Sequence, residues 1–327
     1  MIPNASIQNL FNRLSRATGF VWIVLLQVIG PCQVYCQTMD PGKEFTQVSF
    51  DFRVVARMIV VKAIVDGVHG NFIIDTGSPE LILNATHFES ISKRPAISGI
   101  SGQEVATMRR YVAFEWGPFY VKSKRAFVVD LSHLEGDRNF QFHGIIGYSL
   151  LKAYEIELNY TNHQLTLFCL DKKGNHLTPA VLLERIDHTM VLQMKGHLAC
   201  VAMMVGTYEM CLAIDTGAGL NVFSEKYQEG LAAFLTDERA LTLNGLVRRT
   251  NNASAALVNG LSIGDLGCAP MRTTFRNLDQ LNAQDGLRSI DGFLGYEFLK
   301  QWTTSINYRK REFKIWRTHE FVRKGVE

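Results

Sequence analysis

Residues 72–78 are Phe-Ile-Ile-Asp-Thr-Gly-Ser, and residues 212–218 are Leu-Ala-Ile-Asp-Thr-Gly-Ala. These stretches place Asp75 and Asp215 140 positions apart in a chain of 327 residues. A single Asp-Thr-Gly triplet is a weak signal, because average residue usage produces one by chance in about one of every fifteen chains of this length. Two copies that each follow an apolar run are much harder to obtain by chance, so the pair indicates an internal repeat.

A second motif returns in each copy, in the same order. Residues 144–152 are Gly-Ile-Ile-Gly-Tyr-Ser-Leu-Leu-Lys, and residues 292–300, 148 positions later, are Gly-Phe-Leu-Gly-Tyr-Glu-Phe-Leu-Lys. A repeat this long indicates a duplicated domain and not a solenoid, whose units run to about 20–50 residues. The chain length suits two domains of about 150 residues each. Its 47% hydrophobic and 20% charged residues are the balance of a globular protein.

Both copies have the alternation and the β-branched content of strands. Residues 54–65 form one such run, and Asp66-Gly67 separates it from the apolar residues before Asp75, which predicts a hairpin. Residues 227–239 could form a helix, and residues 171–179 are the expected linker. After each second motif we expect one helical turn and two paired strands, at 149–152, 155–158 and 164–168 in the first copy and at 297–300, 303–307 and 312–316 in the second.

Each Asp-Thr-Gly aspartate follows an apolar strand, where an ionised carboxylate is costly unless something pairs with it. The glycine two residues later permits a tight turn that brings backbone N–H groups to the carboxylate. Thr76 and Thr216 add hydroxyls for supporting hydrogen bonds. If the two loops face each other, both carboxylates cannot ionise cheaply, so one holds a proton. Such a pair is a general base and a general acid in one place, which suits attack of a water on a peptide carbonyl.

With these motifs the chain resembles the aspartic peptidases of the pepsin and retroviral-protease type, over roughly residues 50–170 and 185–317. The resemblance implies a mainly β fold of two homologous closed β-barrel-like lobes, related by a pseudo-two-fold axis with the active site between them. It also implies a cleft for an extended peptide. Ser78 follows the first glycine and Ala218 the second, and both lobes are short. The nearest match is therefore a single-chain tandem retropepsin-like protein.

The resemblance assigns roles to particular residues, with Asp75 and Asp215 as the catalytic dyad. The active-site loops match at Thr76, Gly77, Ser78, Thr216, Gly217 and Ala218. The elements that brace these loops from behind match at Ile145, Ile146, Gly147, Phe293, Leu294 and Gly295. A flap tip over the cleft matches at Gly99, Ile100, Ser101 and Gly102, and its counterpart is Asn244-Gly245.

The predicted function is that of an aspartic endopeptidase, which hydrolyses an extended polypeptide through a water activated by the dyad. An alternative is a module that keeps the fold and binds a peptide without cutting it. Pairing of each copy with another chain is less simple than pairing of the sister copies, so we expect a monomer with an intramolecular pseudo-dimer. The expected partner is a peptide or protein substrate. The net charge of +3 gives no reason to expect nucleic acid.

No cofactor is expected, and the cysteine and histidine spacings fit no metal site. Four cysteines follow the N-terminal segment, enough for two disulfides in any of three pairings. Cys200 and Cys211 fall on neighbouring predicted strands, where they are either bonded or small core residues. The full set is Cys169, Cys200, Cys211 and Cys268.

The N-terminal segment has the pattern of a secretory signal. Arg13 and Arg16 precede an apolar run at residues 20–30, about 11 residues where a membrane span needs about 20. We therefore expect an exported protein, periplasmic or secreted, with no stable membrane span after signal removal; an anchor formed by the same segment is the weaker alternative. The predicted divisions are a signal peptide at 1–36, an N-terminal lobe at 37–172 and a C-terminal lobe at 173–327.

Overall fold

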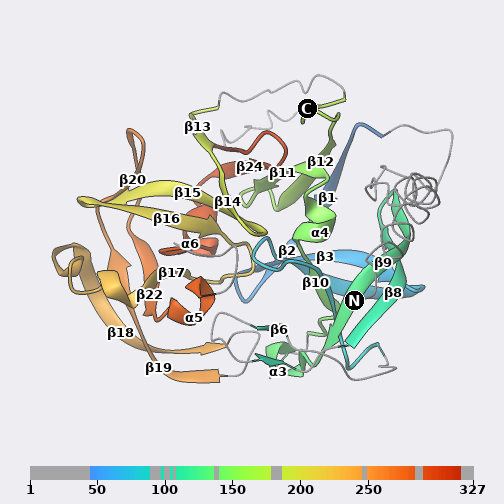
Figure 1. Ribbon diagram of the computed structural model, residues 1–327, viewed down its shortest axis with the longest axis horizontal. Helices are drawn as coiled ribbons and strands as arrows, with labels where there is room; N and C mark the ends of the chain where they lie inside the picture. Colours follow the sequence, from blue (N-terminus) through green and yellow to red (C-terminus); the bar gives the residue numbers. More distant parts are fainter. Residues whose placement is uncertain are drawn as a thin grey trace, which may run out of the picture. The chain divides into compact units, whose positions relative to one another are not determined.

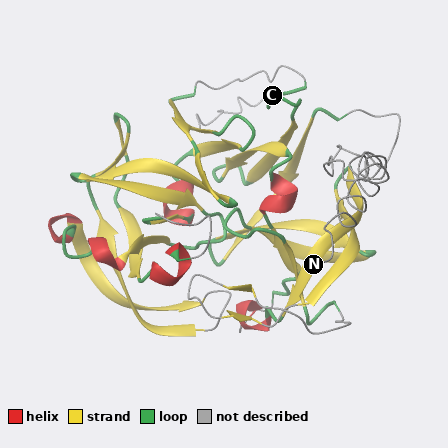
Figure 2. Cartoon of the chain, in the orientation of Figure 1, coloured by secondary structure: helices red, strands yellow, loops and turns green. Residues whose placement is uncertain are grey.

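The computed structural model describes residues 45–88, 97–98, 104–105, 108–135, 140–177, 186–244, 249–283 and 290–317. This part of the chain consists mainly of strands, with short helical turns between them (Figure 2). The predicted signal peptide at residues 1–36 lies outside it. Within the described residues, no helix is both long and apolar enough to cross a membrane.

The first lobe is a closed barrel of six strands with a seventh strand at its edge. Its strands are β2 (Arg53–Val55), β3 (Met58–Val65), β4 (Val68–Ile74), β5 (Leu81–Asn84), β8 (Met108–Trp116), β9 (Phe119–Val129) and β10 (Gly144–Ile146). Their order is β2-β3-β4-β10-β5-β9-β8, and pairing of β3 with β8 closes the ring (Figure 1). Asp66 and Gly67 form the predicted turn between β3 and β4, with φ values of 48° and 79°.

The second lobe repeats this plan as a half-barrel. Its strands are β14 (Gln193–Lys195), β15 (Leu198–Val205), β16 (Tyr208–Ile214), β17 (Asn221–Ser224), β18 (Leu235–Asn244), β19 (Arg249–Val258), β20 (Leu261–Ile263), β21 (Leu266–Gly267), β22 (Met271–Arg276) and β23 (Gly292–Leu294). The order is β18-β19-β22-β17-β23-β16-β15-β20-β21, with β14 on β15. β16 has the same sequence of buried and exposed positions as β4.

A third sheet is shared by the two lobes. Its order is β1-β12-β11-β24-β25-β13, so each lobe contributes three strands. At its centre β11 pairs antiparallel with β24, and Glu157 lies opposite Ser305. The predicted strand pairs after each second motif are confirmed. The bounds are β1 (Gln47–Asp51), β11 (Tyr154–Asn159), β12 (Gln164–Cys169), β13 (His188–Val191), β24 (Thr303–Asn307) and β25 (Glu312–Trp316).

The helices among the described residues are single turns. They are α3 (Ser132–Glu135), α4 (Tyr148–Leu151), α5 (Asp279–Asn282) and α6 (Tyr296–Leu299), with the 3-10 turns η1 (Glu225–Tyr227) and η2 (Ala232–Phe234). α4 and α6 confirm the turns predicted after the second motifs. The helix predicted at 227–239 is wrong: η2 ends at Phe234, and β18 begins at once and pairs with β19. Tertiary pairing of the backbone decides this segment, because local helix propensity is only a weak preference.

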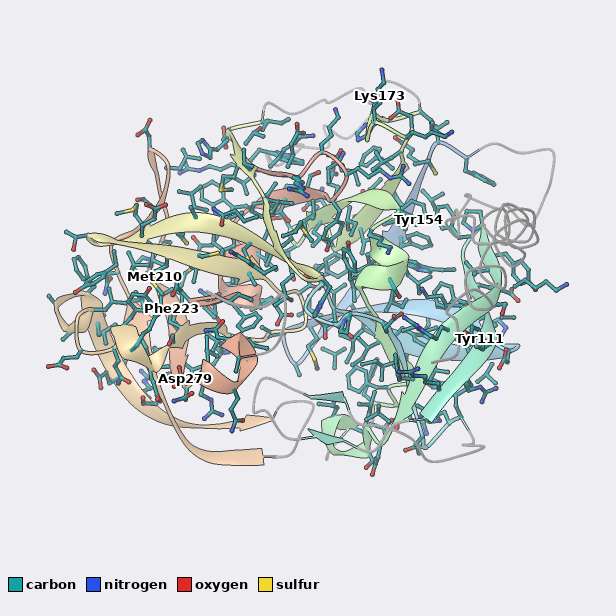
Figure 3. All side chains as sticks on the ribbon, in the orientation of Figure 1. Tyr111, Tyr154, Lys173, Met210, Phe223 and Asp279 are labelled. Carbon is teal, nitrogen blue, oxygen red and sulfur yellow. The ribbon has the colours of Figure 1, made fainter. Side chains whose placement is uncertain are left out.

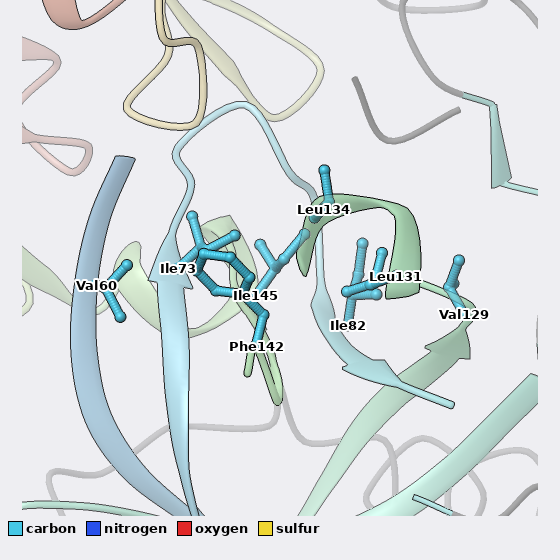
Figure 4. Close-up of a cluster of buried hydrophobic side chains, with 8 residues drawn as sticks. All are labelled: Val60, Ile73, Ile82, Val129, Leu131, Leu134, Phe142 and Ile145. Atoms are coloured by element: carbon cyan, nitrogen blue, oxygen red, sulfur yellow. The ribbon is translucent and has the colours of Figure 1, made fainter. Parts of the chain in front are cut away.

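Each lobe has its own apolar core. In the first lobe Ile73 on β4 lies beside Ile145 on β10, and in the second the matching pair is Ala213 and Phe293. A smaller residue on one strand is thus offset by a larger one on its neighbour, which keeps the core filled. Figure 4 shows the first core: Val60, Ile73, Ile82, Val129, Leu131, Leu134, Phe142 and Ile145. Phe223 on β17 is likewise buried, whereas Tyr111 on β8 is exposed (Figure 3).

The four cysteines carry free thiols in the structure. Cys200 is fully buried in the second core, at the position that Val60 fills in the first. It therefore serves as a small core residue. The predicted lobe boundary at residues 172 and 173 stays a prediction. The first part of the expected linker is an ordered turn, in which Asp171 accepts hydrogen bonds from the backbones of Lys173 and Asn175.

Candidate active site

Asp75 and Asp215 each follow the last residue of a buried strand, β4 and β16 respectively. The backbone N–H of Asp75 donates to Ile146 O at 3.0 Å, and that of Asp215 donates to Leu294 O at 3.0 Å. β10 runs parallel to β4 as β23 does to β16, so both loops leave their sheets in the same way. The two aspartates therefore occupy equivalent positions in the two lobes.

The two side chains lie against each other across the pseudo-two-fold axis. The two carboxyl groups lie close enough for each to shift the pKa of the other. A methyl group added at Gly77 would lie 2.7 Å from Cγ of Asp215, and one added at Gly217 would lie 2.5 Å from Cγ of Asp75. Only a hydrogen fits at these positions, so each glycine is what allows the opposite carboxylate to approach.

Backbone N–H groups point at both carboxylates. Oδ1 of Asp75 accepts hydrogen bonds from Gly77 N at 2.8 Å and from Ser78 N at 3.0 Å. Oδ1 of Asp215 accepts one from Gly217 N at 2.9 Å. These bonds favour the ionised form of a carboxyl group that burial would otherwise keep neutral.

Two threonines tie the loops together beneath the aspartates. The hydroxyl of Thr76 donates to Ile214 O at 2.8 Å, and the hydroxyl of Thr216 donates to Ile74 O at 2.7 Å. Each hydroxyl also accepts the backbone N–H of the other threonine, at 3.0 and 3.1 Å. The two hydroxyls and the two backbone N–H groups are buried, and they have hydrogen-bond partners only when both lobes are present.

The second motifs pack against these loops and bond to them. Gly147 packs so closely that an added methyl group would lie 2.5 Å from Ser78 O, and one at Gly295 would lie 2.3 Å from Ala218 O. The next residue in each motif then donates its backbone N–H to that same oxygen: Tyr148 to Ser78 O and Tyr296 to Ala218 O, both at 2.8 Å. Ile145, Ile146, Phe293 and Leu294 form the buried strands β10 and β23 behind the loops.

Burial dominates the electrostatics of the dyad. It raises the pKa of Asp75, against hydrogen bonds from Asp215 and from the backbone of Gly77 and Ser78. Burial raises the pKa of Asp215 well above its ordinary value, and the neighbouring charge of Asp75 raises it further. The pair therefore holds one proton between two carboxyl groups over a wide range of pH.

Four tyrosines near the dyad were not singled out from the sequence. Tyr148 packs edge-on against Tyr308 with ring centroids 5.1 Å apart, and Tyr160 packs edge-on against Tyr296 at 5.6 Å. Burial raises the pKa of Tyr160 and Tyr308, whose phenols stay neutral. All four recur at the spacing of the second motif, 148 positions, and that spacing is the signal that could have found them.

His197 and Arg57 were also missed, and both reach the loop of the opposite lobe. His197 Nε2 lies 2.8 Å from Gly77 O. A methyl group added at Gly219 would lie 3.5 Å from Cβ of Arg57, and the guanidinium of Arg57 lies 3.7 Å from Glu297. The two residues share the 140-residue spacing of Asp75 and Asp215, so a comparison of the copies position by position could have identified them.

The predicted flap tip, Gly99, Ile100, Ser101 and Gly102, lies outside the described residues. It falls between β6 (Ile97–Ser98) and β7 (Glu104–Val105), which pair antiparallel. Of its predicted counterpart, Asn244 ends β18, and Gly245 lies outside the described residues. Where the structure describes side chains, no cluster of three or more His, Cys, Asp or Glu residues could hold a metal ion.

No protein-family model and no curated protein matches the sequence. Among solved structures, the fold is similar to that of an aspartic proteinase from Irpex lacteus, with a TM-score of 0.50 and 12% sequence identity. The match covers 83% of this chain and 97% of that one. The chain thus has the two-lobed fold of an aspartic proteinase, and the predicted fold class is confirmed.

Proposed function

We propose that this protein is an aspartic endopeptidase, with Asp75 and Asp215 as its catalytic dyad. The observation that carries the proposal is the approach of two buried carboxyl groups, one from each lobe, each of which packs against the glycine of the opposite active-site loop. Purely structural buried carboxylates pair with cations or with hydrogen-bond donors. Two acids placed together, each held by backbone N–H groups, are instead the arrangement that general acid–base chemistry needs.

The reaction follows from one shared proton. The ionised carboxylate takes a proton from a bound water as the water oxygen attacks the peptide carbonyl carbon. The protonated carboxyl group hydrogen-bonds the carbonyl oxygen and stabilises the charge that develops there. The tetrahedral intermediate collapses when the C–N bond breaks and the leaving nitrogen takes a proton from the dyad. The products are a carboxylic acid and an amine, and the dyad again holds one proton.

The supporting residues act by holding the dyad in place. Thr76 and Thr216 fix the two loops relative to each other. Gly147 and Gly295 allow the strands behind to support the loops through hydrogen bonds. Held in this way, the carboxyl groups need little rearrangement as the reaction proceeds.

The proposals on substrate, oligomeric state, export and lobe type rest on the sequence. We propose that the substrate is an extended polypeptide and that the chain acts as a monomer, since sister lobes already supply both aspartates. We also propose that the protein is exported after loss of residues 1–36, and that its two lobes are retropepsin-like units in tandem. Mass spectrometry of the exported fraction tests the export proposal, because an intact Met1 there would overturn it.

Digestion of a peptide library between pH 3 and pH 8 tests the proposed activity, with Asp75→Asn and Asp215→Asn as variants. We expect cleavage by the wild type and none by either variant, with near-normal folding of both by circular dichroism. Identical cuts by all three proteins would rule the dyad out. Peptide binding without any cleavage by the wild type would favour the alternative function, a peptide-binding module.

A further inference from the structure

His197 crosses from the second lobe to the active-site loop of the first. It lies on the turn between β14 and β15, where Gly196 adopts a φ of +60°. Its Nε2 is 2.8 Å from Gly77 O, within the loop of Asp75. A carbonyl oxygen only accepts hydrogen bonds, so Nε2 carries the proton. Nδ1 is then the atom that takes a second proton, and the ring gains a positive charge without losing this bond.

Arg57 occupies the equivalent position in the first lobe, but it makes different contacts. There the turn between β2 and β3 holds both Ala56 and Arg57 at positive φ, 51° and 69°. The guanidinium of Arg57 is 3.7 Å from Glu297, a carboxylate that Lys300 already holds at 2.8 Å. The side chain of Arg57 is half exposed. The two-fold relation between the loops is therefore broken at this point, because His197 bonds the loop of Asp75 whereas the guanidinium of Arg57 lies beside Glu297.

We propose that His197 is a positioning residue that makes the dyad unequal, so that Asp75 is the ionised member and Asp215 carries the proton. The assignment of Asp75 as the base for the water rests on the proposed function. The order of ionisation does not, since it depends on the burial, the hydrogen bonds and the neighbouring charges of the two carboxyl groups.

The charges that face His197 support this order. The charges of Asp75 and Glu80 both raise the pKa of His197, and Glu80 is itself paired with Arg125. The ring of Tyr148 lies 6.4 Å away, with the ammonium of Lys152 over it. Burial lowers the pKa of His197, while the Gly77 hydrogen bond and the charge of Asp75 oppose that fall. Protonation of His197 at Nδ1 would place a positive charge beside the loop of Asp75, and such a charge favours the ionised form of the Asp75 carboxyl group.

The test is a titration of the full chain labelled with ¹³C at the aspartate carboxyl carbons, with Asp75→Asn and Asp215→Asn used to assign the signals. Asp75 should ionise before Asp215 as the pH rises. In His197→Gln, which can still donate to Gly77 O but cannot gain a charge, we expect the midpoint of Asp75 to rise by about half a pH unit or more. The matched control is Arg57→Gln at the equivalent position, which should leave that midpoint unchanged.

A second measurement needs no change at His197. Coupling between two sites is reciprocal, so the midpoint of the His197 ring signals should fall in Asp75→Asn. Unchanged midpoints in both experiments would overturn the inference, as would ionisation of Asp215 first. These titrations need no substrate. If only the proposed hydrolysis is wrong, the wild type will cleave no peptide, while the titration midpoints of Asp75 and His197 will still shift in the variants as described.

Discussion

Thr76 and Thr216 exchange hydrogen bonds across the pseudo-two-fold axis, each hydroxyl accepting the backbone N–H of the other at 3.0 and 3.1 Å. Each hydroxyl also donates to a backbone carbonyl of the opposite lobe, at 2.8 and 2.7 Å. The atoms are buried, so water cannot replace a lost partner. The two lobes are therefore locked together directly beneath the carboxyl pair.

Thr76→Val tests this lock. Valine has nearly the same shape but leaves Ile214 O and the N–H of Thr216 buried without partners. We expect the free energy of unfolding in urea to fall by about 2–4 kcal/mol, because each buried unsatisfied group costs about 1–3 kcal/mol. Thr76→Ser is the control, since it keeps the hydroxyl. Equal losses in both variants would contradict the role given to the hydroxyl.

Gly77→Ala is expected to damage the dyad more than the fold. The added methyl group would lie 2.7–2.8 Å from the carboxyl atoms of Asp215, so the two carboxyl groups must separate. We expect peptide cleavage to fall at least about 100-fold, the size of effect that a misplacement of about 1 Å produces. The control is Gly267→Ala, where an added methyl group meets nothing within 4 Å. Full activity of Gly77→Ala would show that the aspartates do not act as a pair.

Glu155 should make stability depend on pH. Burial raises its pKa, but hydrogen bonds from His176 and Ser305 and the charge of Lys314 outweigh burial and hold the pKa well below its usual value. A lowered pKa in the folded state stabilises the protein above about pH 4.3, the unfolded value, and this stabilisation is lost as the pH falls further.

Glu155→Gln tests that dependence. At pH 7 we expect it to reduce the free energy of unfolding by about 3 kcal/mol, because it leaves the mostly buried Lys314 without its buried carboxylate. The deficit should shrink at pH 3, measured by urea unfolding at both pH values. Glu312→Gln is the control, since that carboxylate is more exposed and lies 3.5 Å from the same lysine. A deficit that stays constant with pH would contradict this account.

The two cores predict a compensating pair of substitutions. Ala213→Ile alone should overpack the second core, and Phe293→Ile alone should leave a gap, each at a cost of about 1–3 kcal/mol. The double variant reproduces the Ile73 and Ile145 pair of the first core, so we expect it to be more stable than the sum of the single effects by about 1 kcal/mol or more. Additive losses in urea unfolding would show that the two residues do not share a cavity.

Much of the fold was predictable because its signals are local. Asp66-Gly67 specifies a hairpin by its own backbone preferences, and the residue pattern in 303–307 and 312–316 predicts two paired strands. The spacing of the repeat then indicated that Asp75 and Asp215 are equivalent. In the structure each aspartate packs against the glycine of the opposite loop, an arrangement that could not follow from either loop alone.

The remaining features depend on partners distant in sequence. Residues 54–65 were predicted as one run, but the chain turns at Ala56 and Arg57, which adopt positive φ without glycine. Nothing local marks that turn. The hydrogen bond from His197 to Gly77 spans 120 residues, and that from Ser305 to Glu155 spans 150. Such contacts exist only once the lobes have met, so the pattern of either segment does not contain them.

The pairing of β11 with β24, here called the seam, also affects which halves of the protein can associate. If two N-terminal halves from different molecules met in the same register, Glu157 would face a second Glu157 where it now faces Ser305. Glu155 would no longer pair with Lys314, because Thr166 occupies the position in the N-terminal half that Lys314 occupies in the C-terminal half. Like charges directly opposite each other on paired strands repel. The seam therefore favours pairing of an N-terminal half with a C-terminal half, and it discourages dimers formed from two N-terminal halves.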